Sequence, residues 1–197
     1  MGGILVKTLI IFAHPKPASF NGAILQACLN KLQEKNHEIR IRDLYEMNFN
    51  PILKDDGFTV KSSTSIPATV RTEQEHLLWA QNLLFIFPTW WGGMPAILKG
   101  YFDRVFTNGF AFEFQAAGSK GLLMNRKAMI FQTTSHPKES LKPYQLISSI
   151  ETIIDVGILQ FCGIETLAHK FFYSVPYVDN QTRENMLKEV EDIVELL

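Results

Sequence analysis

Apolar residues along the chain alternate between short continuous runs and longer stretches with helical spacing. The clearest runs, residues 4–12, 83–87 and 127–132, are rich in β-branched and aromatic side chains. Such runs are typical of strands that are buried on both faces of a sheet. Two further strands are predicted over residues 38–42 and 165–173.

Between these strands the apolar positions recur at the three- and four-residue spacing of helices. The predicted helices cover residues 20–35, 72–82, 95–106, 144–160 and 183–197. Two connections, at about 43–70 and 107–126, are longer than ordinary loops, and such loops are usually functional or mobile.

A strand followed by a helix therefore occurs five times, which predicts a parallel sheet with helices on both faces. Because crossovers between parallel strands are right-handed, the doubly wound folds are the main candidates. Five strands favour the flavodoxin-like α/β order over the six-stranded dinucleotide folds. The length of 197 residues suits one flavodoxin-like domain over residues 1–197.

Composition narrows the functional classes. The formal net charge is -1, so nothing favours nucleic acid as a partner. Two cysteines, Cys28 and Cys162, form no CxxC pattern; we expect both to be buried and the protein to be cytoplasmic. The N-terminal run reads as a strand and not a signal peptide, and no apolar run reaches the ~18–20 residues of a membrane span. The five histidines show no metal-ligand spacing, so no metal is expected.

Ligands of such sheets bind at the carboxyl ends of the strands, where the strand order reverses. The loop after the first strand, AHPKPASFNG, lacks the glycine patterns of dinucleotide turns and P-loops. It offers His14, Lys16, Ser19 and the amides of Phe20 and Asn21 at a helix N-terminus, which favours a phosphate. The alternative is that Ser19 only caps the helix and His14 is a surface residue.

The loop after the third strand reads FPTWWGGMPAILKGYFDRVF. Pro88 ends the strand, and Trp90 and Trp91 follow at the predicted crevice. Gly92 and Gly93 let the backbone approach a flat ring closely. Aromatic walls with free backbone amides fit a flavin, whereas the alternative places both tryptophans in the core or a dimer contact.

The loop after the fourth strand, QTTSHPKESLKPY, supplies Thr133 and Thr134, whose hydroxyls and amides suit a heteroaromatic edge. His136 and Tyr144 are candidate proton donors there, although either is an ordinary loop residue in the alternative interpretation. On the predicted helix over 72–82, Glu73, Glu75 and His76 form a solvated face in this interpretation.

Taken together, the segments AHPKPASFN, DLYEMNFNPIL, FPTWWGGMPAILKGYFDRVF, NGFAFEF, QTTS and GILQFCG resemble the NAD(P)H:quinone oxidoreductase (DT-diaphorase-like) flavoproteins of the short bacterial type. They occur in the order found in that family, from about residue 5 to 165. The resemblance implies a flavodoxin-like fold, a homodimer with a flavin near the dimer interface, and a ping-pong cycle. In that cycle NAD(P)H reduces the flavin by hydride transfer and leaves before the acceptor enters.

The resemblance also implies roles for individual residues. His14, Ser19, Phe20 and Asn21 match residues that hold the phosphate and ribityl chain of the flavin. The loops around its ring system are matched by Pro88, Thr89, Trp90 and Trp91 and by Thr133, Thr134 and Ser135. Aromatic positions of the acceptor pocket correspond to Phe112, Phe114 and Phe161, and an acid–Arg pair at the outer end of the cofactor corresponds to Asp103 and Arg104.

Two departures bear on these roles. The region that carries a Tyr and a His in the best-studied relatives is a few residues shorter here, so Tyr144 and His136 match only with a gap. Ser135 and His136 replace two glycines. The Asp103–Arg104 pair and the SFN segment favour FAD, with FMN as the alternative.

Three functions remain open from the sequence. The first is two-electron reduction of quinones, with nitro and azo compounds as side acceptors. The second is an ancillary regulatory flavoprotein of a potassium-efflux transporter. The third is a one-electron carrier, which near-neutral charge disfavours because such carriers dock through strongly charged surfaces.

Overall fold

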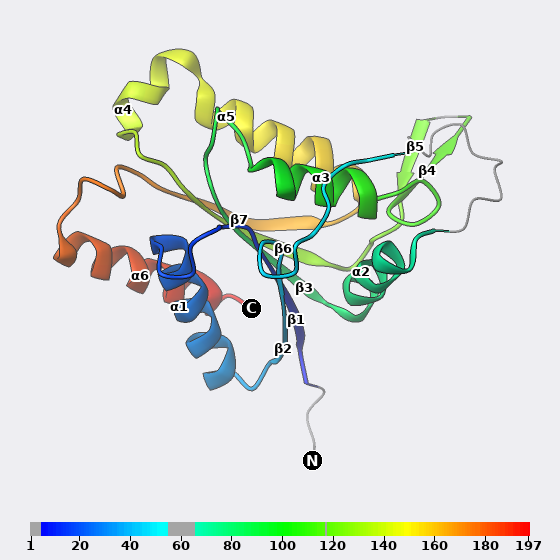
Figure 1. Ribbon diagram of the computed structural model, residues 1–197, viewed down its shortest axis with the longest axis horizontal. Coiled ribbons are helices and arrows are strands. Elements are labelled where there is room, and N and C mark those ends of the chain that lie inside the picture. The colour runs from blue at the N-terminus through cyan, green and yellow to red at the C-terminus, as the bar shows by residue number, and fades with distance from the viewer. Residues whose placement is uncertain (1–4, 55–65, 117) are drawn as a thin grey trace.

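A five-stranded parallel sheet runs through the centre of the computed structural model, which describes residues 5–54, 66–116 and 118–197 (Figure 1). The sheet consists of β1 (Lys7–Phe12), β2 (Glu38–Asp43), β3 (Asn82–Pro88), β6 (Lys127–Thr133) and β7 (Glu165–Phe172). Two further strands, β4 (Phe112–Gln115) and β5 (Gly118–Gly121), pair only with each other. The helices are α1 (Phe20–Glu34), α2 (Ala68–Trp79), α3 (Ala96–Val105), α4 (Lys138–Leu141), α5 (Leu146–Glu151) and α6 (Asn180–Val194), with the 3₁₀-helices η1 (Lys142–Tyr144) and η3 (Gln160–Cys162) and a π-helix η2 (Thr152–Leu159).

The order across the sheet is β2-β1-β3-β6-β7, and every neighbouring pair is parallel. This confirms the predicted doubly wound, flavodoxin-like arrangement. The order reverses between β1 and β3, so the loops that follow these two strands leave the same edge of the sheet in opposite directions. The loop that follows β6 emerges beside them because β6 pairs with β3.

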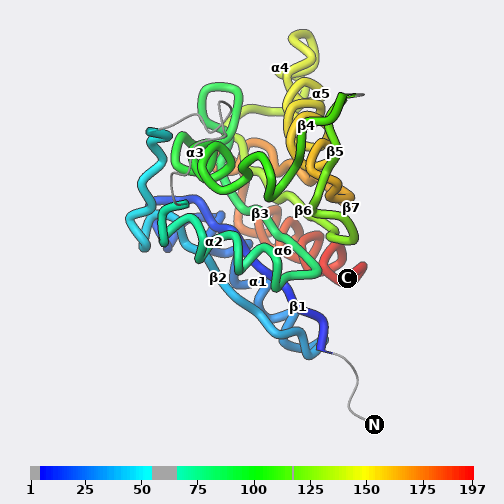
Figure 2. Tube along the Cα trace, turned by 90° about the vertical axis from the view of Figure 1, so that its right-hand side faces the viewer, coloured from blue at the N-terminus to red at the C-terminus, as the bar shows by residue number. Residues whose placement is uncertain are grey.

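Helices cover both faces of the sheet, as the two views show (Figures 1 and 2). On one face α1 and α6 pack around a core that includes Ile24, Leu32 and Val190. On the other face α2, α3, α5 and η2 enclose a larger core that includes Leu98 and Tyr101. All seven residues of β3 are buried, as the apolar run of that segment predicts.

Four segments differ from the prediction. The 107–126 connection contains an antiparallel hairpin, β4–β5, which pairs Phe112 with Gly121. The predicted helix over 144–160 begins at Leu146, because the left-handed backbone of Gln145 (φ 49°) separates it from the turn η1. The last helix begins at Asn180 because the Asp179 carboxylate accepts from the Thr182 N–H at 2.7 Å. Helix α2 begins at Ala68; of the 43–70 loop, residues 55–65 lie outside the described residues, as do residues 1–4 of the first predicted strand.

Glu73 does not lie on a solvated face, although the sequence pattern indicates one. Its side chain is 2% exposed and accepts from Arg42 of β2, with 3.0 Å between Arg42 Nε and Glu73 Oε2. The hydroxyl of buried Tyr101 donates to the same oxygen at 3.4 Å. Burial and then the negative charge of Glu73 raise the pKa of Tyr101 well above its ordinary value, so the phenol stays protonated.

Among the described residues, no single helix is long and apolar enough to cross a bilayer. Two consecutive helical segments, residues 138–144 and 146–162, together have the length and apolar composition of a membrane span, but they meet at an angle of 74°.

Candidate functional site

The three loops that the sequence singles out converge at the carboxyl edge of the sheet. The Asn21 amide of the first loop donates to Thr133 Oγ1 of the third at 2.9 Å. The Thr89 N–H of the second loop donates to the Thr133 carbonyl at 2.7 Å. The rings of His14 and Trp90 lie 6.1 Å apart between their centroids. Residues far apart in the sequence therefore form one site.

A cavity of about 450 Å³, here called the aromatic cavity, opens between the second and third loops. It is lined by Thr89, Trp90, Trp91, Gly92, Thr134, Ser135, His136, Leu141, Leu146, Ile147 and Ile150. One side is formed by indoles, hydroxyls and backbone, and the other by the apolar residues of α4 and α5. This combination suits a flat ring with a polar edge.

The second loop presents Trp91 to solvent. Trp90 and Gly93 exchange two backbone hydrogen bonds, at 2.9 and 3.0 Å, which close a tight turn. Within that turn Trp91 has a left-handed backbone (φ 51°), which is uncommon for a bulky residue. Its side chain is fully exposed, at 106%. Trp91 is therefore not a core residue, and the turn holds an aromatic face at the mouth of the aromatic cavity.

The first loop packs closely against the start of α1. Ser19 caps the helix by accepting from the Gly22 N–H at 3.2 Å. A Cβ at Gly22 would lie 1.8 Å from the Pro17 carbonyl oxygen, so this approach requires glycine. The first N–H groups of α1, at Phe20 and Asn21, have no partner within the helix and favour an anion.

Asn21 has a property that points to a ligand near this helix start. Asn21 is 3% exposed, and its Oδ1 is buried without a hydrogen-bond partner among the described residues. An unpaired buried acceptor is costly, and a hydroxyl or N–H donor of a bound molecule would satisfy it. Burial lowers the pKa of His14, and the charge of Lys16 lowers it further, whereas the hydrogen bond to the Lys16 carbonyl raises it.

The two candidate proton donors lie in different surroundings. His136 lines the aromatic cavity, and its Nδ1 lies 3.3 Å from Ser135 Oγ. Tyr144 lies on η1, before the break at Gln145, and is 80% exposed. Tyr144 is not among the residues that line the aromatic cavity.

The remaining predicted residues lie away from this cavity. Phe112 packs against Phe114 and Phe161, with ring centroids 5.3 and 5.0 Å apart, beside the β4–β5 hairpin. On α3, Asp103 pairs with Lys99. Arg104 lies over the Phe49 ring at 5.3 Å and donates to the Asn50 carbonyl.

A buried polar relay behind Thr89 was missed by the sequence analysis. Gln132 of β6 is fully buried, and its Nε2 donates to Thr89 Oγ1 at 2.7 Å. His169 of β7 contacts Gln132 Oε1 through Nε2 at 3.1 Å and Asp155 Oδ1 of η2 through Nδ1 at 2.9 Å. The sequence does contain a signal for this relay, because Gln132 and His169 are polar residues within strand segments that are otherwise apolar. In the described part of the chain, no group of three or more His, Cys, Asp or Glu residues is placed to hold a metal ion.

Comparisons with known proteins agree with this geometry. A family model described as the flavodoxin-like fold matches residues 6–196. A relative from Haemophilus influenzae, named as an uncharacterized NAD(P)H oxidoreductase, is 36% identical over 181 residues, 91% of this chain and 90% of its own length. NAD(P)H dehydrogenase (quinone) 1 of Cavia porcellus is 35% identical, over 96% of this chain and 78% of its own. The solved NAD(P)H:quinone oxidoreductase from Methanothermobacter marburgensis superposes with a TM-score of 0.87 at 28% identity, covering 97% of this chain and 96% of that one.

Proposed function

The chain belongs to the family with the flavodoxin-like fold, and from this premise we propose that it is a flavin-dependent NAD(P)H oxidoreductase that reduces quinones by two electrons. The observation that carries the proposal is the aromatic cavity, where two indoles, hydroxyls and backbone meet at the carboxyl edge of the sheet. The names of its relatives, which are NAD(P)H oxidoreductases and quinone dehydrogenases, support the reaction class.

The residues present fit a flavin at both of its ends. The start of α1, with the N–H groups of Phe20 and Asn21 beside the Ser19 cap, is suited to its phosphate. The unpaired Oδ1 of Asn21 is suited to a hydroxyl of its ribityl chain. The ring system fits the aromatic cavity beside Trp90 and Trp91. When bound, the flavin supplies the chemistry of accepting and passing on a hydride, while the protein orients it and tunes its surroundings.

His136 is the side chain best placed to handle a proton in this cavity, because it lines the cavity and an imidazole can act as a general acid or base. Tyr144 is the second candidate. Its exposed position on η1 requires the segment around Gln145 to move before the phenol reaches the cavity.

FAD is the proposed form of the flavin, with FMN as the alternative. Asp103 and Arg104 lie on α3, and Arg104 holds the Phe49–Asn50 backbone that precedes residues 55–65. Extraction of the flavin followed by chromatography distinguishes the two forms. Recovery of FMN alone would end the preference for FAD.

Quinones are the proposed acceptors, and nitro and azo compounds are side acceptors, because a cavity that binds flat rings by stacking discriminates poorly among them. Use of the aromatic cavity by both substrates favours a ping-pong cycle, in which NAD(P)H leaves before the quinone enters. Double-reciprocal plots at several quinone concentrations should then be parallel, and intersecting lines would require both substrates to be bound together.

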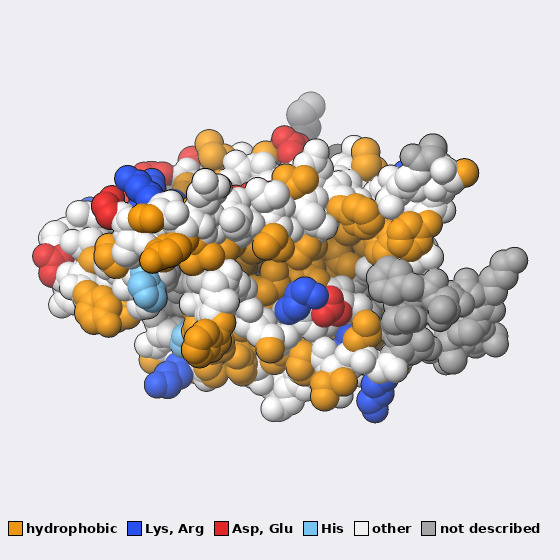
Figure 3. All heavy atoms as spheres, turned by 90° about the horizontal axis from the view of Figure 1, so that it is seen from above, with side chains coloured by type: hydrophobic (Ala, Val, Ile, Leu, Met, Phe, Trp, Pro, Cys, Tyr) orange, Lys and Arg blue, Asp and Glu red, His pale blue; other side chains and the backbone are white. Residues whose placement is uncertain are grey.

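A homodimer is the proposed assembly. An apolar groove of about 220 Å³ is lined by Gly92, Gly93, Met94, Lys99, Ile150, Ile153, Ile154 and Ile158. This groove borders the aromatic cavity, and apolar side chains gather in a band across the same face (Figure 3). Exposed apolar surface of this kind marks interfaces. Sedimentation equilibrium should give twice the chain mass.

The two unpaired cysteines fit a cytoplasmic setting.

The central test is the visible spectrum of the purified protein before and after anaerobic addition of NAD(P)H. We expect oxidised-flavin bands near ~370 and ~450 nm that bleach on addition and return with a quinone. A protein that takes up neither FAD nor FMN would refute the proposal.

A further inference from the structure

The buried polar relay consists of Asp155, His169, Gln132 and Thr89, and it joins the surface of η2 to the wall of the aromatic cavity. Asp155 is 22% exposed at its side chain, whereas the His169 side chain is 3% exposed and Gln132 is fully buried. Asp155 also lies in a π-helix, a rare form that is frequent at functional sites. Four polar groups in such a position need a reason, because the strand face around them is otherwise apolar.

The hydrogen-bond directions fix the protons in this arrangement. Gln132 Nε2 donates to Thr89, so Gln132 Oε1 must accept, and His169 Nε2 therefore carries a hydrogen. The contact between His169 Nδ1 and the Asp155 carboxylate needs a second hydrogen on the ring. This amide orientation thus corresponds to a doubly protonated, positively charged imidazole beside a carboxylate.

A neutral imidazole requires the opposite amide orientation. If Nδ1–H still donates to Asp155, Nε2 is an acceptor, and the Gln132 side chain must rotate so that its NH₂ faces His169. Gln132 Oε1 then faces Thr89 and accepts from the Thr89 hydroxyl. Both orientations have the same shape, so the exchange needs no backbone movement. It releases one proton to water when His169 becomes neutral and takes one up when His169 becomes charged.

The direction of the Thr89 hydroxyl differs between the two states. With charged His169, Thr89 Oγ1 accepts from Gln132 and its own hydrogen is directed toward the aromatic cavity that Thr89 lines. With neutral His169, the same hydrogen is directed back to Gln132, and the cavity meets only the oxygen lone pairs.

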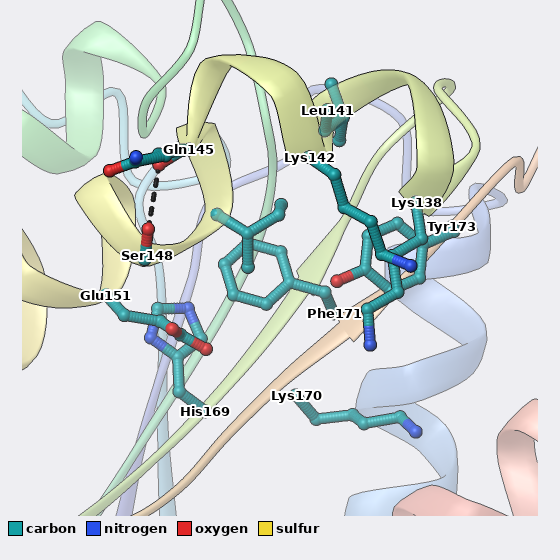
Figure 4. A pocket seen from close by; sticks show the side chains of 11 residues that line it. Lys138, Leu141, Lys142, Gln145, Ser148, Glu151, His169, Lys170, Phe171 and Tyr173 are labelled. Atoms are coloured by element: carbon teal, nitrogen blue, oxygen red, sulfur yellow. Dashed lines mark hydrogen bonds between the residues drawn. The ribbon is translucent and has the colours of Figure 1, made fainter.

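Water can supply the proton through a second cavity of about 470 Å³, which His169 lines from β7 (Figure 4). The Phe171 ring stacks on His169 at 4.5 Å and closes one side of the imidazole. Asp155 of η2 contacts His169 directly. The titratable and charged groups that line the second cavity with His169 are Glu151 of α5, Lys138 of α4, Lys142 of η1, and Lys170 and Tyr173 at the end of β7, and Lys170 is paired with Glu189 of α6.

We propose that His169 is a positioning residue whose protonation sets the direction of the Thr89 hydroxyl, so that the aromatic cavity offers a hydrogen-bond donor to an acceptor atom of the bound ring only when His169 is charged. The proposal rests on the proposed function, in which that ring is a flavin. It makes flavin affinity depend on pH through His169, a residue that does not touch the flavin.

The protonation itself is tested in the protein without flavin, by ¹⁵N NMR of histidine-labelled protein from about pH 5 to 9. The His169→Gln variant identifies the signals. We expect both ring nitrogens to carry hydrogen at the acidic end and only Nδ1 at the alkaline end. His37→Gln, on the opposite side of β1, should leave this change in place. A ring that keeps only the Nε2 hydrogen throughout would overturn the proposal.

The consequence is tested by the Kd of FAD, measured by fluorescence quenching at both ends of the pH range. FAD should bind ~3- to 10-fold more tightly at the acidic end in the unaltered protein, which is the value of one hydrogen bond. Thr89→Val keeps the shape, removes the hydroxyl and should abolish this difference, whereas Thr72→Val on exposed α2 should not. Equal pH profiles with and without the Thr89 hydroxyl would overturn the inference and leave the proposed function standing. No binding of FAD or FMN at any pH would refute the proposed function, while the NMR titration would still report on His169.

Discussion

Replacing Arg42 by methionine should destabilise the fold far more than its place at the edge of the sheet indicates. The change leaves the Glu73 carboxylate, which is 2% exposed, without its cationic partner. Removal of one member of a buried pair costs about 3–5 kcal/mol, and the 22% exposure of Arg42 places this pair at the lower end, at about 3 kcal/mol. For a chain of this length that loss corresponds to a fall of about 6–12 °C in Tm.

The double variant Arg42→Met/Glu73→Leu separates charge from packing. Replacing both members by apolar residues removes the unpaired charge and should recover part of the lost stability. The remaining deficit, about 1 kcal/mol or more, is the cost of leaving the buried Tyr101 hydroxyl without its acceptor. Lys99→Met, which breaks an exposed pair with Asp103, is the matched control and should cost less than ~0.5 kcal/mol.

Urea unfolding followed by circular dichroism gives these free energies. The reasoning fails if Arg42→Met costs less than about 1 kcal/mol, or if the double variant is as unstable as the single one.

Three further predictions concern the site and the thiols. Trp91→Ala should weaken flavin binding about 10-fold, because the flavin ring loses the exposed indole on which it stacks. An unchanged Kd would show that Trp91 is not part of the site. Tyr144→Phe should slow anaerobic flavin reduction if the phenol carries charge, and normal stopped-flow rates would leave His136 or water as the donor. Burial raises the pKa of Cys162 to about 12 and raises that of Cys28 further, so neither thiol should react with iodoacetamide at pH 8 until urea unfolds the protein. Alkylation of the native protein, read by mass spectrometry, would show that these thiols are accessible.

The sheet and its order could be predicted from the sequence because buried parallel strands have a local signature. The run that forms β3 is apolar at nearly every position and ends at Pro88, as expected. The resemblance to NAD(P)H:quinone oxidoreductases is confirmed by the family match and the relatives, and burial of both cysteines is confirmed as well. The convergence of His14, Trp90 and Thr133 follows from the rule that ligands bind where the strand order reverses.

The errors arose where the deciding partner is distant in the sequence. Helical spacing cannot show that Glu73 faces Arg42, 31 residues away in the sequence. The apolar pattern of a strand likewise cannot show that His169 contacts Gln132, 37 residues away. The break at Gln145 depends on a left-handed backbone that its side chain does not announce. The β4–β5 hairpin joins strands of four residues each, which are too short for a clear period.

The left-handed backbone of Trp91 costs the fold stability, although the same turn presents the indole at the site. A bulky residue in this conformation costs roughly 1–3 kcal/mol, and glycine would relieve that strain. A library of variants selected only for heat resistance should therefore accumulate glycine at position 91, while selection for a bright flavin colour should keep tryptophan. The residue found at position 91 would then show whether a variant had been selected for stability or for flavin binding.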